Sequence, residues 1–110
     1  MSSEKSCKVI AYFSIVPVGK KSTSLGSYVA TAIMAINKVK GLTCKITPMG
    51  TVMEARSLER IFEAVKAAHE SLISKGILRI ESTLILDDRR DKPRTMKDKV
   101  NSVKKYMNQP

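Results

Sequence analysis

The middle of the chain reads LTCKITPMGTVMEA, residues 42–55, and this stretch decides the fold. Residues 42–47 and 51–55 are rich in the β-branched and apolar side chains that favour strands. Between them stand Pro48, Met49 and Gly50, a typical turn in which proline fixes φ and glycine relieves the strain that follows. The stretch is therefore predicted to form a β-hairpin.

A strand and a helix are predicted on each side of this hairpin. Upstream, residues 7–16 (CKVIAYFSIV) form a β-branched and aromatic run, and residues 25–36 show the apolar period of an amphipathic helix. Downstream, Ser57 is expected to cap a second amphipathic helix that ends at Gly76, and residues 78–86 alternate as a strand does. This order is the split βαβ pattern. We therefore predict an α+β, ferredoxin-like βαββαβ domain, with a four-stranded antiparallel sheet and two helices on one face.

A further helix is predicted at the C-terminus. Thr95 and Asp98 have the spacing of a capping box. The apolar side chains that follow form a narrow stripe, namely Met96, Val100, Val103 and Met107. A stripe this narrow packs on a neighbour more often than it builds a core, so contact with another subunit and packing within the chain are both open.

The sheet face opposite the two helices is expected to be half apolar. On it we place Ile10, Tyr12, Met53 and Ile85, mixed with Ser14, Glu54, Arg79, Glu81 and Thr83. Such a surface suits the packing of two subunits sheet to sheet, which predicts a homodimer. RNA-binding proteins of the same fold place bases on this face.

The length of 110 residues allows one domain with one core. We place it at residues 7–107, with short tails at 1–6 and 108–110. No apolar run approaches the ~20 residues of a membrane span, and the N-terminus lacks the pattern of a secretory signal, so we expect a cytoplasmic protein without membrane contact. Cys7 and Cys44 lack the spacing and partners of a zinc or redox motif, and we interpret them as small buried hydrophobes.

The charge is strongly basic, with 20 Lys and Arg against 10 Asp and Glu, a net charge of +10. These basic residues are spread along the chain, which favours a solvated lysine-rich surface. An anionic ligand or nucleic acid is the alternative. Nucleic acid is disfavoured because residues 51–55 lack the aromatic side chains that RNA-binding sheets stack on bases.

The sequence offers no catalytic constellation. No Ser-His-Asp set, metal-ligand spacing or glycine-rich phosphate loop can be assembled, so we expect no enzymatic activity, no metal and no cofactor. Enzymes of the acylphosphatase type share this fold, but they need an arginine and a glycine-rich turn where PVGK, residues 17–20, stands here. His69 lies on the apolar side of the second helix and is either a core or interface residue or a ligand contact. A purely structural interaction module is a further alternative.

The loop before the first helix is one candidate for binding. Lys20, Lys21, Thr23 and Ser24 lie where that helix begins, so ammonium groups, hydroxyls and free N–H groups could hold an anion there. Equally, Thr23 or Ser24 could simply cap the helix.

Two further candidates carry charge. Glu54 is either a solvated or ion-paired strand carboxylate or, if it faces a cleft, the acceptor of two N–H bonds from an aminopyrimidine. Arg89 and Arg90 lie in DDRRDK, residues 87–92, where alternating charges pair with each other or with a second subunit. Adjacent arginines could also clamp a carboxylate or phosphate.

Four separated motifs resemble the small thiamine-binding protein family: FSIVPVG (13–19), SLGSYVA (24–30), PMGTVME (48–54) and DDRRDK (87–92). The resemblance implies a ferredoxin-like subunit, dimers with facing sheets, a homotetramer, and non-catalytic binding of thiamine or its hydroxymethylpyrimidine part by a carrier or sensor. Residue by residue, it implies a ligand site at Ser14, Thr23, Ser24, Thr51, Glu54, Arg89 and Arg90. The thiazolium ring of thiamine could lie against Tyr12 or Tyr28. The pair Lys20 and Lys21 departs from the small polar residues of the family, which leaves a phosphorylated ligand open.

Overall fold

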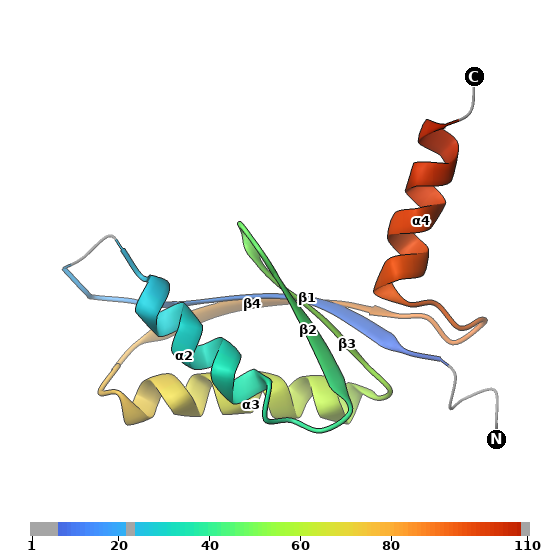
Figure 1. Cartoon of the computed structure of the whole chain (residues 1–110). Coiled ribbons are helices and arrows are strands. Elements are labelled where there is room, and N and C mark those ends of the chain that lie inside the picture. Colours follow the sequence, from blue (N-terminus) through green and yellow to red (C-terminus); the bar gives the residue numbers. More distant parts are fainter. Residues whose placement is uncertain (1–6, 22–23, 109–110) are drawn as a thin grey trace.

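The fold was obtained as a computed structural model that describes residues 7–21 and 24–108. Its sheet has the strand order β2-β3-β1-β4, and every neighbouring pair is antiparallel. The elements along the chain are β1 (Val9–Pro17), α2 (Gly26–Ile36), β2 (Leu42–Thr47), β3 (Gly50–Ala55), α3 (Leu58–Ser74), β4 (Ile80–Asp88) and α4 (Met96–Met107) (Figure 1). The predicted ferredoxin-like βαββαβ fold with an added C-terminal helix is confirmed.

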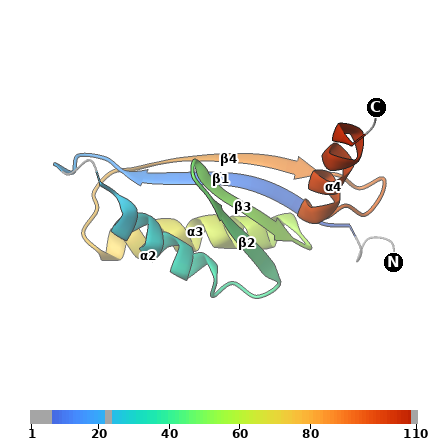
Figure 2. The ribbon, with the colours of Figure 1, turned by 45° about the horizontal axis from the view of Figure 1, so that its top comes forward.

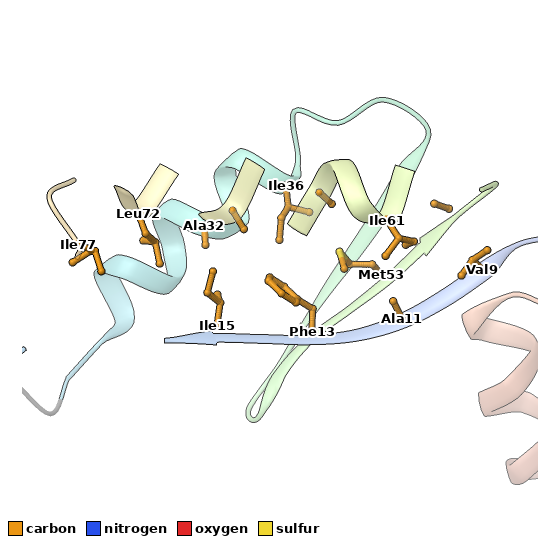
Figure 3. Packing of buried hydrophobic residues seen from close by; sticks show 13 residues of the cluster. Val9, Ala11, Phe13, Ile15, Ala32, Ile36, Met53, Ile61, Leu72 and Ile77 are labelled. Atoms are coloured by element: carbon orange, nitrogen blue, oxygen red, sulfur yellow. The ribbon is translucent and has the colours of Figure 1, made fainter. Parts of the chain in front are cut away.

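The core lies between the sheet and the helices α2 and α3, which cover one face of it together (Figures 1 and 2). β1 alternates buried and partly exposed side chains, as a strand with one covered face does. The largest fully buried side chains come from four elements: Phe13, Ile36, Met53, Ile61 and Leu72 (Figure 3). As predicted, Ser57 caps α3, because its hydroxyl accepts a hydrogen bond from the Arg60 N–H at 3.4 Å.

One residue predicted for the uncovered sheet face belongs to the core instead. Met53 is 0% exposed and lies opposite Ala11 in the register of β1 and β3. Side chains alternate along a strand, so Met53 cannot share a face with its neighbour Glu54. Val52, opposite Tyr12, takes the place that we predicted for Met53.

The hairpin is confirmed, but Gly50 has a different role from the one predicted. Gly50 is the first residue of β3 and is not among the glycines with positive φ, so it relieves no backbone strain. A Cβ atom at Gly50 would instead lie 2.6 Å from the ring of Tyr12. The side chain of Tyr12 reaches from β1 to the hairpin here, and its Oη donates a hydrogen bond to the Met49 carbonyl at 2.6 Å. The glycine therefore makes room for an aromatic side chain.

Smaller differences concern the ends of elements and the cysteines. The N-cap position of α2 is Leu25, so the prediction of Thr23 or Ser24 as the cap was wrong. Cys7 and Cys44 are half-buried rather than buried, and burial raises the pKa of the Cys44 thiol. In the described part of the chain no helix has the length and apolar character needed to cross a membrane.

The opposite face of the sheet, which we call the open face, carries no helix of the βαββαβ unit. α4 rises on this side, away from α2 and α3 (Figure 1). Its predicted capping box is confirmed, because Thr95 and Asp98 each accept a hydrogen bond from the other's backbone N–H at 3.1 Å. The strand register places on the open face Ile10, Tyr12, Ser14, Val52, Glu54, Thr83, Ile85 and Asp87.

Candidate functional site

A pocket opens where β1 separates from β3. β1 pairs with β4 over its whole length, but it pairs with β3 only from Val9 to Phe13. Beyond Phe13 the hairpin of β2 and β3 runs diagonally away from β1 (Figures 1 and 2). The space between them is a cavity of about 220 Å³, bounded by the end of β1, by α2 and by the hairpin tip.

The walls of this pocket are mostly apolar. They are formed by Phe13, Ile15, Val16, Val29, Ala32, Ile33, Ile36, Ile46, Pro48 and Met49. The side chains at the hairpin tip are open to solvent, with Ile46 67% and Met49 81% exposed, whereas Phe13 and Ile36 at the base are each 1% exposed. A flat apolar group could therefore enter past the hairpin and reach the core side of β1.

The polar lining consists of hydroxyl and backbone groups. Ser14, Thr47, Gly50 and Thr51 line the pocket, and no charged side chain does so among the described residues. The Thr47 hydroxyl already donates a hydrogen bond within the protein, to the Gly50 carbonyl at 2.7 Å. Thr51 is 5% exposed, and its hydroxyl makes no hydrogen bond within the described part of the chain. Because no buried side-chain oxygen lacks a partner among the described residues, the Thr51 hydroxyl is itself accessible, and a ligand in the pocket could contact it.

Glu54 lies at the other end of the sheet and is engaged by the protein itself. Its side chain accepts a hydrogen bond from the Met96 N–H at 2.6 Å and an ion-paired one from Lys8 Nζ at 3.3 Å. Glu54 is opposite Ile10 on β1, four residues before Ser14, which corresponds to about 13 Å along a strand. The carboxylate that the sequence suggested for an aminopyrimidine instead holds the start of α4.

Arg89 and Arg90 also pair with nearby carboxylates. Arg89 binds Asp91 with two hydrogen bonds of 2.7 and 3.0 Å, and Arg90 binds Asp88 at 2.8 Å. Hydrogen bonds from these arginines hold the pKa of Asp88 and of Asp91 below the usual value. The alternating charges therefore pair within the loop, which is one of the two interpretations of this motif.

Arg90 also lines a second, polar cavity of about 520 Å³ at the start of α3. Lys8, Arg56, Glu59 and Asp88 line it as well, so charges of both signs surround it. This cavity lies beside the first residues of β1, whereas the apolar pocket lies beside its last. The residues predicted for one ligand site are thus divided between two regions.

The loop before α2 takes no part in either cavity, as far as it is described. Thr23 lies outside the described residues. Lys20 and Lys21 are exposed, and Lys20 Nζ lies 5.6 Å from the centre of the Tyr28 ring, a cation–π distance. His69 is half-buried, with Nε2 2.8 Å from the Ser82 hydroxyl, so it links α3 to β4.

Sequence reasoning identified two residues of the apolar pocket, Ser14 and Thr51, and missed its walls. The missed residues are apolar ones such as Val29, Ile33 and Met49, which an amphipathic pattern assigns to the core or to a turn. A signal was nevertheless present. The motifs at 13–19, 24–30 and 48–54 each contribute at least one residue to this pocket.

Fold and pocket together define a ferredoxin-like protein with a small apolar pocket at the end of its first strand. The family model described as thiamine-binding protein matches residues 11–104, so the chain belongs to that family. A UPF0045 protein of Methanothermobacter thermautotrophicus is 47% identical over 96 residues, which cover 87% of this chain and 96% of the relative.

Solved structures agree with the fold. A hypothetical protein of Methanocaldococcus jannaschii is 36% identical, with a TM-score of 0.79 over 88% of this chain and 96% of the other. A Thermotoga maritima protein, named as a candidate thiamine biosynthesis or salvage protein, has a TM-score of 0.71 at 23% identity, over 87% of this chain and 98% of the other. At that identity the likeness concerns the fold alone.

Proposed function

We propose that the protein binds thiamine or its hydroxymethylpyrimidine part in the apolar pocket, as a carrier or sensor and without catalysing a reaction. The observation that carries this proposal is that three of the four family motifs line one pocket. The name of the Thermotoga maritima structure supports a role in thiamine metabolism. The proposal includes no resident cofactor.

The pocket suits the pyrimidine part best. Ligand sites combine apolar walls with a few polar groups that fix orientation. A neutral pyrimidine ring meets apolar walls and the hydroxyl of Thr51, which can donate to a ring nitrogen or accept from the amino group. The cationic thiazolium ring would then extend past Met49 at the exposed hairpin tip.

The other residues implied by the resemblance take secondary parts in this proposal. Ser14 lies at the pocket edge and is a second hydroxyl contact. Glu54, Arg89 and Arg90 shape α4 and the loop before it rather than touching the ring. We further propose that copies pair through their open faces and that two pairs form the tetramer.

Titration calorimetry tests the ligand. Protein freed of bound small molecules by unfolding and refolding is titrated with thiamine and, separately, with hydroxymethylpyrimidine, and binding heat is expected with at least one. Thr51→Val removes this hydroxyl at nearly constant shape, and we expect about tenfold weaker binding because the polar group of the ligand that it contacts is left unpaired, which costs about 1–3 kcal/mol. Thr83→Val, on the open face, is the matched control and is expected to leave affinity unchanged. Absence of heat with both ligands would refute the proposal.

A further inference from the structure

The apolar pocket is built by a stretch of chain that carries positive charge only. Residues 7–53 contain six lysines and neither aspartate nor glutamate. Every residue that lines the pocket belongs to this stretch, from Phe13 to Thr51. The next acid along the chain, Glu54, lies at the other end of the sheet, opposite Ile10. The local charge around the pocket is therefore more one-sided than that of the whole protein.

Two of these lysines lie close to the pocket wall without lining it. Lys45 precedes the wall residue Ile46 on β2, and Lys20 Nζ lies 5.6 Å from the ring centre of Tyr28, the neighbour of the wall residue Val29. The loop that carries Lys20 and the tip of the hairpin lie on either side of the first turn of α2 (Figures 1 and 2). Both lysines are exposed, and neither makes an ion pair in the described part of the chain. Their charges are therefore available to a ligand group that projects from the pocket.

One acid is paired in strand register with a residue of the pocket wall. Glu81 on β4 lies opposite Val16, whereas the β4 partners of Phe13, Ser14 and Ile15 are uncharged. Arg79, two residues before Glu81, carries the opposite charge. The side of the pocket that faces β4 is therefore close to neutral. The uncompensated positive charge lies on the side of α2 and the hairpin.

This charge distribution favours a ligand with a negative group outside the pocket. The thiazolium ring of thiamine is a cation, and no carboxylate among the described residues lines the pocket to neutralise it. A phosphate monoester carries a charge of about −1.5 to −2 at pH 7, and lysine binds phosphate as a flexible point charge. We propose that the pocket selects the phosphate ester of hydroxymethylpyrimidine over the free pyrimidine and over thiamine, with the ring between the apolar walls and the phosphate in the field of Lys20 and Lys45. This inference rests on the proposed function, because it requires the pyrimidine ring to enter the apolar pocket.

Titration calorimetry at two salt concentrations tests this selection. Full-length protein freed of bound small molecules is titrated with hydroxymethylpyrimidine, with its phosphate ester and with thiamine. At about 0.01 M salt we expect the ester to bind about tenfold more tightly than the free pyrimidine, because positive charge beside a cleft concentrates anions there. At about 1 M salt this difference should disappear, since exposed charges are then screened within about 3 Å. Thiamine should show the opposite salt dependence, because salt weakens its repulsion by the lysines.

Two double variants that lose the same charge locate the effect. Lys20→Gln with Lys45→Gln should lower the affinity for the ester to about that for the free pyrimidine. Lys66→Gln with Lys104→Gln removes equal charge from exposed positions on α3 and α4 and should leave the preference for the ester intact. Equal affinity of the wild-type chain for ester and free pyrimidine, or the same loss in both double variants, would overturn the charge selection alone. Absence of heat with all three ligands would instead refute the proposed function.

Discussion

Gly50 is a residue where one added methyl group would disturb two elements. A Cβ atom there meets the Tyr12 ring at 2.6 Å, so the ring must move and release its hydrogen bond to the Met49 carbonyl. We expect Gly50→Ala to lower the free energy of unfolding by about 1 kcal/mol, the usual net contribution of one hydrogen bond. Urea denaturation measures this value.

Two variants make that measurement specific. Gly26→Ala introduces a Cβ with nothing within 4 Å, so we expect no loss of stability there. In a Tyr12→Phe background the hydrogen bond to the Met49 carbonyl is already absent. Gly50→Ala should therefore lower the free energy of unfolding by less in this background than in the wild-type chain. Full additivity of the two changes would contradict the contact.

Glu54 shows what a residue pattern can and cannot predict. The predicted place of Glu54 on the open face is confirmed, but the same prediction wrongly put its neighbour Met53 there, although strand alternation separates the two. The partner of its carboxylate, the Met96 N–H, lies 42 residues away in sequence, and no local signal connects the two. The sequence therefore identifies Glu54 as a strand carboxylate that needs a partner, whereas the partner that it binds is decided by tertiary contact.

At the scale of elements, the attachment of α4 depends on this carboxylate. We expect Glu54→Ala to make amide exchange in residues 96–107 roughly tenfold faster or more, because a hydrogen bond to a charged group contributes about 1.5–3 kcal/mol. Glu54→Gln keeps an oxygen acceptor for the Met96 N–H and should show a smaller effect. Hydrogen exchange followed by mass spectrometry measures both, and Glu81→Ala on the same face serves as the control. Unchanged exchange in Glu54→Ala would show that other contacts hold the helix.

The capping box makes α4 sensitive to acid. Hydrogen bonds from the Thr95 backbone and side chain lower the pKa of Asp98 from its ordinary value of 3.8. The folded helix therefore favours the charged carboxylate, so its stabilisation is complete above that ordinary value and is lost as pH falls through the lowered one. We expect NMR chemical shifts of residues 96–107 to lose helical character in that range. Asp98→Asn should be less helical at pH 7 and should lack this transition.

The order of the elements was predictable because the apolar residues of each helix and strand recur at the spacing typical of that element. The hairpin, both amphipathic helices and the capping box of α4 follow from residues close together in sequence. The diagonal course of the hairpin was not predictable, because it depends on where pairing between β1 and β3 stops, after Phe13 and Thr51. The pocket exists only because of that separation. From the sequence pattern alone, its wall residues are therefore assigned to the core or to a turn.

At the scale of the whole molecule, the ligand pocket and the C-terminal helix α4 use different parts of the chain. The apolar pocket includes no residue beyond Thr51, and the core cluster includes none from α4. A chain that ends at Lys92 should therefore keep a folded sheet and core. In this truncated chain Glu54 loses its hydrogen bond from the Met96 N–H but keeps its ion pair with Lys8.

We expect this truncated chain to unfold cooperatively in urea and to bind thiamine or hydroxymethylpyrimidine as tightly as the full chain does. Removal of residues 109–110 alone is the control and should change neither property. Loss of ligand binding in a truncated chain with an intact core would mean that the ligand site is not confined to the pocket before Thr51. Unfolding would mean that α4 stabilises the sheet, contrary to its lack of buried residues.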